Sequence, residues 1–544
     1  MVRTQLSNSP EPVSTFPALL AEIVAARRDH PAVVLVDEIL TYDELDRRSA
    51  RMARALLASG VGKGSRIALL APDGALWLTT FYAALRIGAL VTPISTLTTP
   101  PELAHIVRTS DVQLLIGARR LLRRDFAANL TAAFPELRDD RAGALRLLGA
   151  PYLRSVWLDD AEGLPWARPV DELLDRADAP DAPDAALLAA VEREVSPSDD
   201  AFVVYTSGTT ATPKAVVHSQ WAAARQPRAL APIFLMASSD RTMPLLPAFW
   251  MGGIAAALEV LCTGSTLVYP ATPNVEDALD MIERHDVTYV VIWQALAKFR
   301  AAAIARGIDV DRIRGTGAPP RDEHGELIPP GLRANLFGMS ETFSAHSAEP
   351  INRRMPDDKR GASGRAVNGI ERRVVDPETG AEMRPGEVGE LHLRGGALMT
   401  GFYKVDRRDV FTPDGFYPTH DLVWIDADGY LHFVGRTADM IKTNSANVSR
   451  LEVEAALNAL PEVELSLVAG VPDADLGEMV VAAVVLAKGA TPTEDDLRTA
   501  LRDRISGFKI PRRIVFITDD DVPRTTTGKV RLGDLAELIE SHQR

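Results

Sequence analysis

The chain has 544 residues, of which 46% are hydrophobic and 25% charged, so it is long enough for several domains and is not a disordered polymer. Its formal net charge is −14, from 60 Lys+Arg against 74 Asp+Glu. A surface of that sign repels nucleic-acid phosphates and anionic lipid, so we expect neither as a partner. No run of about 18 apolar residues is present, which argues against a membrane span.

Cysteine and lysine are both scarce in this chain. Cys262 is the only cysteine, so no internal disulfide can form, and no Cys/His cluster has zinc spacing. The polar N-terminus contains no apolar segment of the signal-peptide type. We therefore expect a cytoplasmic protein. Only nine residues are lysine, and arginine supplies the other positive charges, so each lysine is a candidate for a role that a planar guanidinium cannot fill.

Helical and strand patterns alternate in the first part of the chain. The helical segments are residues 16–28, 44–58 and 75–88, and the short apolar strands are residues 32–36, 66–70 and 90–93. This alternation predicts a parallel α/β sheet. Residues 176–199 are rich in Asp, Ala and Pro, and we expect them to form a surface connection.

A second α/β block follows, and then two regions of different character. Its expected strands lie near residues 202–205, 266–269 and 287–293. Between residues 361 and 434 short strands alternate with turn signals, which predicts a small β-rich subdomain. From Gly435 onward, helices at 451–460 and 495–505 and strands at 463–470, 479–486 and 514–517 predict a separate α+β domain.

One loop has the composition of a phosphate-binding site. Tyr205-Thr-Ser-Gly-Thr-Thr-Ala-Thr-Pro-Lys214 follows the apolar strand at residues 201–204. Hydroxyls, backbone N–H groups and an ammonium gathered in one loop match the oxygens of a polyphosphate. The alternative is an ordinary polar surface turn, and the residues alone leave the two readings about even. A Walker A motif is absent.

The loop resembles the phosphate-binding signature of the adenylate-forming superfamily, which includes acyl-CoA synthetases, luciferases and peptide-synthetase adenylation domains. Ala211 and Ala215 stand where that signature has glycine. Further segments match the family in order, so the resemblance extends over residues 16–535. They are Gly317-Ala318-Pro319, Phe337-Gly338-Met339-Ser340-Glu341-Thr342, Thr419-His420-Asp421, Gly435-Arg436 and Pro523-Arg-Thr-Thr-Thr-Gly-Lys529.

The resemblance implies an α/β fold with a large N-terminal domain (residues 1–435), built from two α/β subdomains and the β-rich subdomain, and a mobile C-terminal α+β domain (436–544) that turns about a hinge near Ala438. It also implies roles for individual residues. Lys529, Ser340 and Lys214 are the expected catalytic residues, and Glu341 is the expected Mg²⁺ ligand. The expected ATP- and AMP-binding residues are Thr206, Ser207, Gly208, Thr209, Thr210, Gly317, Ala318, Pro319, Phe337, Gly338, Met339, Asp421 and Arg436.

The same resemblance suggests where the acid and the acceptor bind. The acid pocket is expected around Trp250, Gly252, Trp293 and His346, although Trp250 is equally well explained as a core residue. Ala438, Lys442 and Ser445 belong to the segments that relatives use in the second half-reaction. Ala438 replaces the usual Lys or Asp, Ser445 a usual glycine, and Arg450 a usual proline, so thioester formation is less firmly implied than adenylation.

The leading hypothesis is therefore an AMP-forming acid–thiol ligase of the acyl-CoA synthetase type. It would use ATP, Mg²⁺ and CoA to convert a small carboxylic acid into an acyl-adenylate and then into an acyl-CoA. A second hypothesis keeps the first step but transfers the acyl group to the pantetheine of a separate carrier protein or to another nucleophile. A third is a non-catalytic nucleotide-binding relative, which the presence of Lys214, Glu341 and Lys529 argues against.

Overall fold

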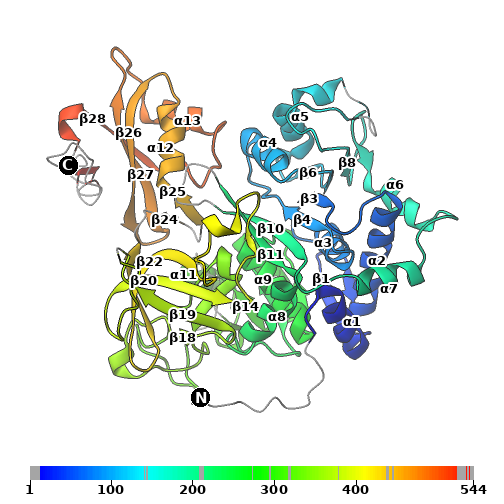
Figure 1. The fold of residues 1–544 in the computed structure, drawn as a ribbon, viewed down its shortest axis with the longest axis horizontal. Coiled ribbons are helices and arrows are strands. Elements are labelled where there is room, and N and C mark those ends of the chain that lie inside the picture. The colour runs from blue at the N-terminus through cyan, green and yellow to red at the C-terminus, as the bar shows by residue number, and fades with distance from the viewer. Residues whose placement is uncertain are drawn as a thin grey trace.

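The computed structural model describes residues 13–139, 141, 145–206, 213–272, 274–292, 296–315, 320–377, 379–436, 440–443, 446–522, 535 and 538–539, and for residues 435, 436, 440, 447 and 451 the backbone alone. Two lobes are apparent (Figure 1). We call residues 13–436 the N-terminal lobe and residues 440–539 the C-terminal lobe. The predicted hinge at Ala438 lies outside the described residues, so the exact domain boundary stays a prediction.

An eight-stranded sheet forms the first α/β layer of the N-terminal lobe. Its strands are β3 (Arg66–Leu70), β4 (Leu90–Pro93), β5 (Leu114–Gly117), β8 (Ser155–Leu158), β9 (Arg168–Pro169), β10 (Asp200–Thr206), β11 (Lys214–Ser219) and β21 (Gly401–Phe402). Their order is β21-β11-β10-β4-β3-β5-β8-β9. β3 is parallel to β4 and β5, as the alternating pattern predicted, because helices make the crossovers.

Six helices lie among the described residues in this part of the chain, and one of them packs against β3, β4, β5 and β10 of this sheet. The helices are α2 (Tyr42–Ala58), α3 (Ala75–Arg86), α4 (Pro100–Thr109), α5 (Phe126–Ala133), α6 (Val170–Asp175) and α7 (Ala185–Arg193), and a small hairpin pairs β6 (Arg120–Leu121) with β7 (Arg124–Asp125). The expected surface connection at residues 176–199 is only partly correct, because α7 occupies it. Asp184 caps α7 by accepting a hydrogen bond from Leu187 N, and Leu188 is buried.

A six-stranded sheet forms the second α/β layer. Its strands are β1 (Pro31–Val34), β2 (Ile39–Thr41), β12 (Arg241–Pro244), β13 (Thr266–Val268), β14 (Tyr289–Val291) and β15 (Arg314–Gly315), and its helices are α1 (Phe16–Arg27), α8 (Gln220–Leu230), α9 (Met251–Thr263), α10 (Val275–His285) and α11 (Leu296–Ala305). β1 pairs in parallel with β13 rather than with the nearby β3. The expectation that residues 18–118 build one sheet is therefore wrong for this strand.

The β-rich region holds two further sheets. One contains β16 (Phe337–Met339), β17 (Ser344–Ala348) and β18 (Arg365–Ala366), and the other contains β19 (Ile370–Val375), β20 (Gly389–Gly395), β22 (Tyr417–Ile425) and β23 (Leu431–Arg436). All three pairings in the four-stranded sheet are antiparallel. The short strands and turn signals between residues 361 and 434 predicted β18, β19, β20, β22 and β23, but β16 and β17 precede that range and β21, within it, joins the eight-stranded sheet.

The C-terminal lobe has its own sheet and its own hydrophobic core. Its elements are β24 (Met440–Thr443), β25 (Ala446–Ser449), α12 (Arg450–Asn458), β26 (Val463–Asp473), β27 (Gly477–Leu486), α13 (Glu494–Leu501) and β28 (Arg513–Ile517). Val453, Leu497 and Ile514 belong to one buried cluster that contains no residue of the N-terminal lobe. Within the described ranges, no helix combines the length and apolar character needed to cross a membrane.

Candidate functional site between the lobes

The main cavity of interest lies where the two lobes meet and has a volume of about 940 Å³. Its lining includes four of the predicted site residues of the N-terminal lobe, Thr206, Trp250, Gly252 and Ser340, and it also includes segments that supply residues not predicted to belong to the site. Those segments contribute Glu102, His105, Phe249, Ala446, Glu452, Ser506, Phe508 and Lys509. Because both lobes supply its walls, the cavity depends on how the lobes are oriented.

The predicted phosphate loop joins two paired strands at one end of this cavity. Thr206 ends β10, Lys214 begins β11, and the two residues are cross-strand partners. The Lys214 ammonium lies 5.0 Å from the centroid of the Phe402 ring. It makes no ion pair with any described residue, and is therefore available to an anionic ligand. The loop residues Ser207, Gly208, Thr209 and Thr210 lie outside the described residues, so their predicted contacts stay predictions.

A tight turn carries Ser340 and Glu341. A Cβ added to Gly338 would lie 2.1 Å from Ser344 O, so this strand position accepts only glycine without rearrangement. Thr342 Oγ1 donates to Ser344 O (2.7 Å) and accepts from Met339 N (3.2 Å), and Thr342 is fully buried. The turn therefore holds Ser340 in a fixed position at the cavity wall.

His218 supports this turn from the neighbouring strand β11, and sequence reasoning did not single it out. Its Nε2 lies 2.7 Å from Ser340 O, a distance at which the ring N–H donates to the carbonyl. The ring also packs edge-on against Phe343, at 5.3 Å between centroids. Burial lowers the pKa of His218 to about 4, despite the opposing effect of that hydrogen bond, so the imidazole is neutral at physiological pH.

The two predicted ribose-binding residues are brought together by strand pairing. Asp421 in β22 is fully buried and is the cross-strand partner of Arg436 in β23. His420, between Thr419 and Asp421, has φ of +61°, a conformation that glycine adopts without strain. Glu390 stabilises His420 in this conformation, since its Oε1 lies 3.1 Å from both the His420 backbone N and Nδ1.

The predicted acid pocket is only partly assembled. Trp250 and Gly252 line the cavity at the start of α9, and Trp250 packs edge-on against Phe249 and Phe508, with centroids 5.5 and 6.2 Å away. Trp293 lies outside the described residues. His346 does not line the cavity. It is completely buried on β17, where its ring packs against Phe337, so its predicted role in the acid pocket is wrong.

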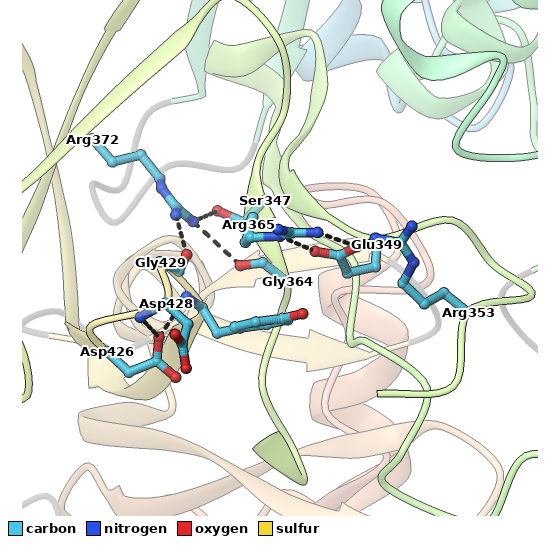
Figure 2. Close-up of polar contacts among 10 residues, drawn as sticks. Ser347, Glu349, Arg353, Gly364, Arg365, Arg372, Asp426, Asp428 and Gly429 are labelled. Carbon is cyan, nitrogen blue, oxygen red and sulfur yellow. Dashed lines mark hydrogen bonds and ion pairs between the residues drawn. The ribbon is translucent and has the colours of Figure 1, made fainter. Parts of the chain in front are cut away.

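His346 belongs instead to a polar network behind the site. Its Nδ1 lies 2.9 Å from Ser347 Oγ, and Figure 2 shows the Arg372 guanidinium reaching that same hydroxyl (2.7 Å) and the Gly429 carbonyl (2.6 Å). Burial, together with the nearby Arg372, lowers the pKa of His346 to about 3. Directly after this strand, the buried Glu349 pairs with Arg353 and with Arg365 of β18. Arg372 lies on β19, so its hydrogen bond to Ser347 links β17, which follows the Ser340 turn, to the four-stranded sheet.

Some of the remaining predicted residues lie within the described ranges, and others lie outside them. Phe337 and Met339 lie in β16, the Lys442 ammonium is 5.9 Å from the Phe337 ring centroid, and the Tyr417 hydroxyl donates to Glu341 Oε1 at 3.5 Å. The part of the chain that is described contains no group of three or more His, Cys, Asp or Glu able to hold a metal by themselves. The predicted residues outside the described ranges are Gly317, Ala318, Pro319, Ala438, Ser445 and Lys529.

Cys262 has no features of a nucleophile. It lies on α9, its Sγ donates to the Glu259 carbonyl at 3.2 Å, and burial raises the pKa of its thiol far above the usual range.

Comparison with known proteins agrees with the two-lobe architecture. The model of the family described as AMP-binding enzyme matches residues 20–403, and that of the AMP-binding enzyme C-terminal domain matches residues 452–529. A feruloyl-CoA synthase from Amycolatopsis sp. is 30% identical over 506 residues (91% of this chain, 93% of the relative). A fatty acid–[acyl-carrier-protein] ligase from Streptomyces coeruleorubidus is 29% identical over 525 residues (93% of each chain).

Solved structures share the fold along nearly the whole length. An amide bond synthetase from Marinactinospora thermotolerans superposes with a TM-score of 0.74 and 24% identity, and the match covers 96% of this chain and 99% of that one. At this identity the likeness concerns the fold alone. The family match spans well over half of the chain, and two of the motif residues, Thr206 and Ser340, line the interlobe cavity. This chain is therefore a member of the AMP-binding enzyme family, the adenylate-forming enzymes.

Proposed function

We propose that this protein is an AMP-forming acid–CoA ligase. A carboxylate attacks the α-phosphorus of ATP, the bond to the pyrophosphate group breaks, and an acyl-adenylate forms. A thiol then attacks the acyl carbon, the mixed anhydride bond breaks, and AMP leaves. The carboxylate is already ionised, so the first step needs cations and hydrogen-bond donors more than a general base.

The observation that carries this proposal is the shared cavity. Thr206 and Ser340 lie in its wall at the ends of a β-strand and a tight turn, and aromatic side chains line it elsewhere. Hydroxyl and backbone donors held by a rigid scaffold suit phosphate oxygens, and they need no rearrangement as negative charge develops. Lys214 beside Thr206 would add a cation, and Asp421 with Arg436 would hold the ribose, as the family motifs imply.

Glu341 fits a magnesium ion that is bound largely by the nucleotide. Mg²⁺ in such sites is bound by one or two protein carboxylates and by phosphate oxygens and water. A single glutamate on the Ser340 turn is consistent with that donor set, whereas a site built from protein ligands alone is absent from the described residues. Bound Mg²⁺ would neutralise part of the triphosphate charge.

Aromatic side chains in the cavity favour an aromatic carboxylic acid as substrate. Phe249 and Trp250 line the cavity from the N-terminal lobe. Planar rings pack against such side chains in edge-on or offset arrangements that add to simple burial of apolar area. The feruloyl-CoA synthase relative acts, by its name, on a phenolic acid. We therefore place ferulate and related aryl acids at the head of the substrate panel.

A second opening at the lobe interface supports an anionic acceptor. This opening has a volume of about 710 Å³, and residues 98–102 and 503–509 separate it from the main cavity. Five arginines line it, together with two acidic residues: Arg123, Arg124, Arg498, Arg502 and Arg512, and Asp125 and Asp503. Of these arginines, only Arg498 makes an ion pair with a described residue, and Arg124 donates a hydrogen bond to Thr96 O. Unpaired guanidiniums in a chain of net charge −14 suit the phosphates of CoA.

The same opening also suits an acidic carrier protein, and the similarity to a fatty acid–[acyl-carrier-protein] ligase makes a carrier protein the second candidate acceptor.

The test is pyrophosphate release with ATP and a panel of acids that starts with ferulate, measured without acceptor, with CoA, and with a purified phosphopantetheinylated carrier protein. We expect an acyl-CoA product by mass spectrometry and release that increases with CoA. Acyl transfer only to the carrier would establish the alternative, and no release from a broad panel would overturn both and leave a non-catalytic nucleotide-binding relative.

A further inference from the structure

A buried charge cluster joins the two lobes beside the main cavity. Glu102 lies in the first turn of α4 in the N-terminal lobe, Glu452 lies in the first turn of α12, and Lys509 follows α13 in the C-terminal lobe (Figure 1). The Lys509 Nζ donates to Glu102 Oε1 at 2.8 Å and to Glu452 Oε1 at 2.7 Å. Ser506 adds two hydrogen bonds to Glu102, from its N (3.1 Å) and Oγ (2.6 Å).

The side chains of this cluster are almost fully shielded from solvent, and the cluster contains two carboxylates but only one ammonium. The side chains of Lys509, Glu102 and Glu452 are 7%, 12% and 9% exposed. Burial opposes the charge on Lys509, yet the two carboxylates outweigh it and raise the lysine pKa. Burial likewise raises the pKa of Glu452, whose Oε2 has no hydrogen-bond partner among the described residues. The ammonium is therefore the group that lets two carboxylates from different lobes approach each other.

The contacts of Glu102 divide cleanly between the lobes. Within the N-terminal lobe, Glu102 Oε2 accepts from Thr99 N (2.9 Å) and completes a capping box at the start of α4. Every hydrogen bond from Ser506 and Lys509 to Glu102 crosses to the C-terminal lobe. Burial alone would raise the pKa of Glu102, but Lys509 and these hydrogen bonds hold it below its ordinary value. A carboxylate at this position is thus stabilised by the lobe contact itself.

The cluster forms only with one face of the C-terminal lobe toward the cavity. In this orientation Ala446, on the β24–β25 hairpin, lines the cavity together with Ser340, and Phe508 packs against Trp250 at 6.2 Å. A rotation that presented another face of the lobe would carry Lys509 away from α4 and leave Glu102 without its ammonium. The face now in place bears the hairpin that contains Lys442 and precedes α12.

We propose that Glu102, Lys509 and Glu452 form an electrostatic latch that selects this lobe orientation for the acyl-transfer step and is open during adenylation. The inference rests on the proposed two-step function. These three are positioning residues: they fix the C-terminal lobe, which in turn places the hairpin and Phe508 at the cavity. Lys509 neutralises the approach of the two carboxylates while the lobes are in this orientation, and a rotation of the C-terminal lobe removes Lys509 together with Glu452 from Glu102.

The decisive variant is Glu102→Gln. Glutamine can complete the capping box, and the Glu452–Lys509 pair inside the C-terminal lobe stays intact, so both lobes should fold. Pyrophosphate exchange should change by no more than about twofold, whereas transfer of the preformed acyl group to CoA should fall by about 10–100-fold, the equivalent of losing charge-assisted hydrogen bonds. Lys509→Arg keeps the positive charge and should restore most of the transfer rate relative to Lys509→Gln.

A matched control is Glu276→Gln, which removes the same charge from an exposed ion pair with Arg306 in the N-terminal lobe and should change neither step. Equal effects of Glu102→Gln on both half-reactions, or none on transfer, would overturn the latch.

A second measurement does not depend on the proposed activity. Donor and acceptor dyes would be attached at Glu136→Cys and Lys488→Cys, two exposed positions on different lobes, in a Cys262→Ala background. Single-molecule energy transfer on the unliganded protein should show one dominant distance, and Glu102→Gln should broaden or shift it. An unchanged distribution would reject the latch even if no acid is ever found to react. A shifted distribution in a protein that releases no pyrophosphate would reject the proposed function and keep the latch.

Discussion

The Ser340 turn and the interlobe cluster are both parts of one cavity wall, but they are stabilised in different ways. The turn is held by contacts inside the N-terminal lobe: His218 to Ser340 O, Thr342 to Ser344 O, and the close approach at Gly338. The cluster of Glu102 and Lys509 exists only across the lobe boundary. One half of the site is therefore permanent, whereas the other half depends on the orientation of the lobes. This is the arrangement that two successive reactions in one cavity require.

The largest expected effect concerns the residue predicted to act when the cluster is open. Lys529 lies outside the described residues, and the family motif predicts that it bridges the acid and the phosphate during adenylation. Lys529→Ala should lower pyrophosphate exchange by about 10²–10³-fold, because one preorganised charge contact commonly contributes that much. Transfer from a synthetic acyl-adenylate to CoA should stay near the wild-type rate. This is the opposite of the pattern expected for Glu102→Gln, and near-normal exchange would contradict the assignment.

The next effect tests the permanence of the turn. Gly338→Ala would place a methyl group 2.1 Å from Ser344 O, so the β16–β17 pair must move. We expect a loss of about 3 kcal/mol in the free energy of unfolding, at the upper end of overpacking costs. Both half-reactions should fall together, since the displaced turn serves both. Denaturant unfolding monitored by fluorescence measures the first quantity. Gly401→Ala, where a Cβ meets nothing within 4 Å, is the matched control.

Several strands of the N-terminal lobe, which carries the Ser340 turn, were predicted well from the sequence. The strands at residues 66–70 and 90–93 coincide with β3 and β4, because a parallel strand covered on both faces is a continuous apolar run. The place of β1 in the second sheet was not predictable, since its partner β13 is more than 200 residues away and local pattern does not encode partners. The roles of Ser340 and Asp421 came from the resemblance of their motifs to the family, and these roles stay predictions.

The orientation-dependent half was much less accessible to sequence reasoning. The scarcity of lysine marked Lys509 as one of nine positions to examine, but its partner Glu102 is 407 residues away. His218 was missed because a lone histidine in an apolar strand has the pattern of a core residue. His346 was misplaced because four of the five residues of β17 are buried and none of them lines the cavity, which a local pattern of residue types does not reveal.

Low pH should lower the free energy of unfolding because of His218, which supports the Ser340 turn. The unfolded pKa is about 6.5 and the folded pKa about 4, so above pH 6.5 the histidine is neutral in both states. Below pH 6.5 the unfolded chain takes up a proton that the folded protein does not, and stability falls as the pH drops toward 4. At pH 5 this contribution is about 2 kcal/mol. The His218→Gln variant can keep a donor to Ser340 O but cannot be protonated.

The measurement is the difference in unfolding free energy between pH 7 and pH 5 for both proteins. The decline should be smaller in His218→Gln by about 2 kcal/mol, and the remainder of the decline should include a share from the buried His346, whose pKa is about 3. Identical declines in the two proteins would show that the imidazole of His218 is protonated as readily in the folded state as in the unfolded chain.

The smallest expected effect separates packing from charge at the lobe boundary. Phe508→Leu removes the edge-on contact with Trp250 (6.2 Å between centroids) but leaves the Lys509 ion pairs in place. An aromatic pair contributes about 0.5–1.5 kcal/mol beyond burial, so transfer to CoA should slow by about 2–10-fold while pyrophosphate exchange is unchanged. Trp250→Leu removes the same contact but also changes a wall that serves both steps, so it should affect exchange as well. If Phe508→Leu slowed transfer as much as Glu102→Gln, aromatic packing rather than charge would dominate the contact between the lobes. The proposal that the Glu102–Lys509–Glu452 cluster fixes the lobe orientation would then be rejected.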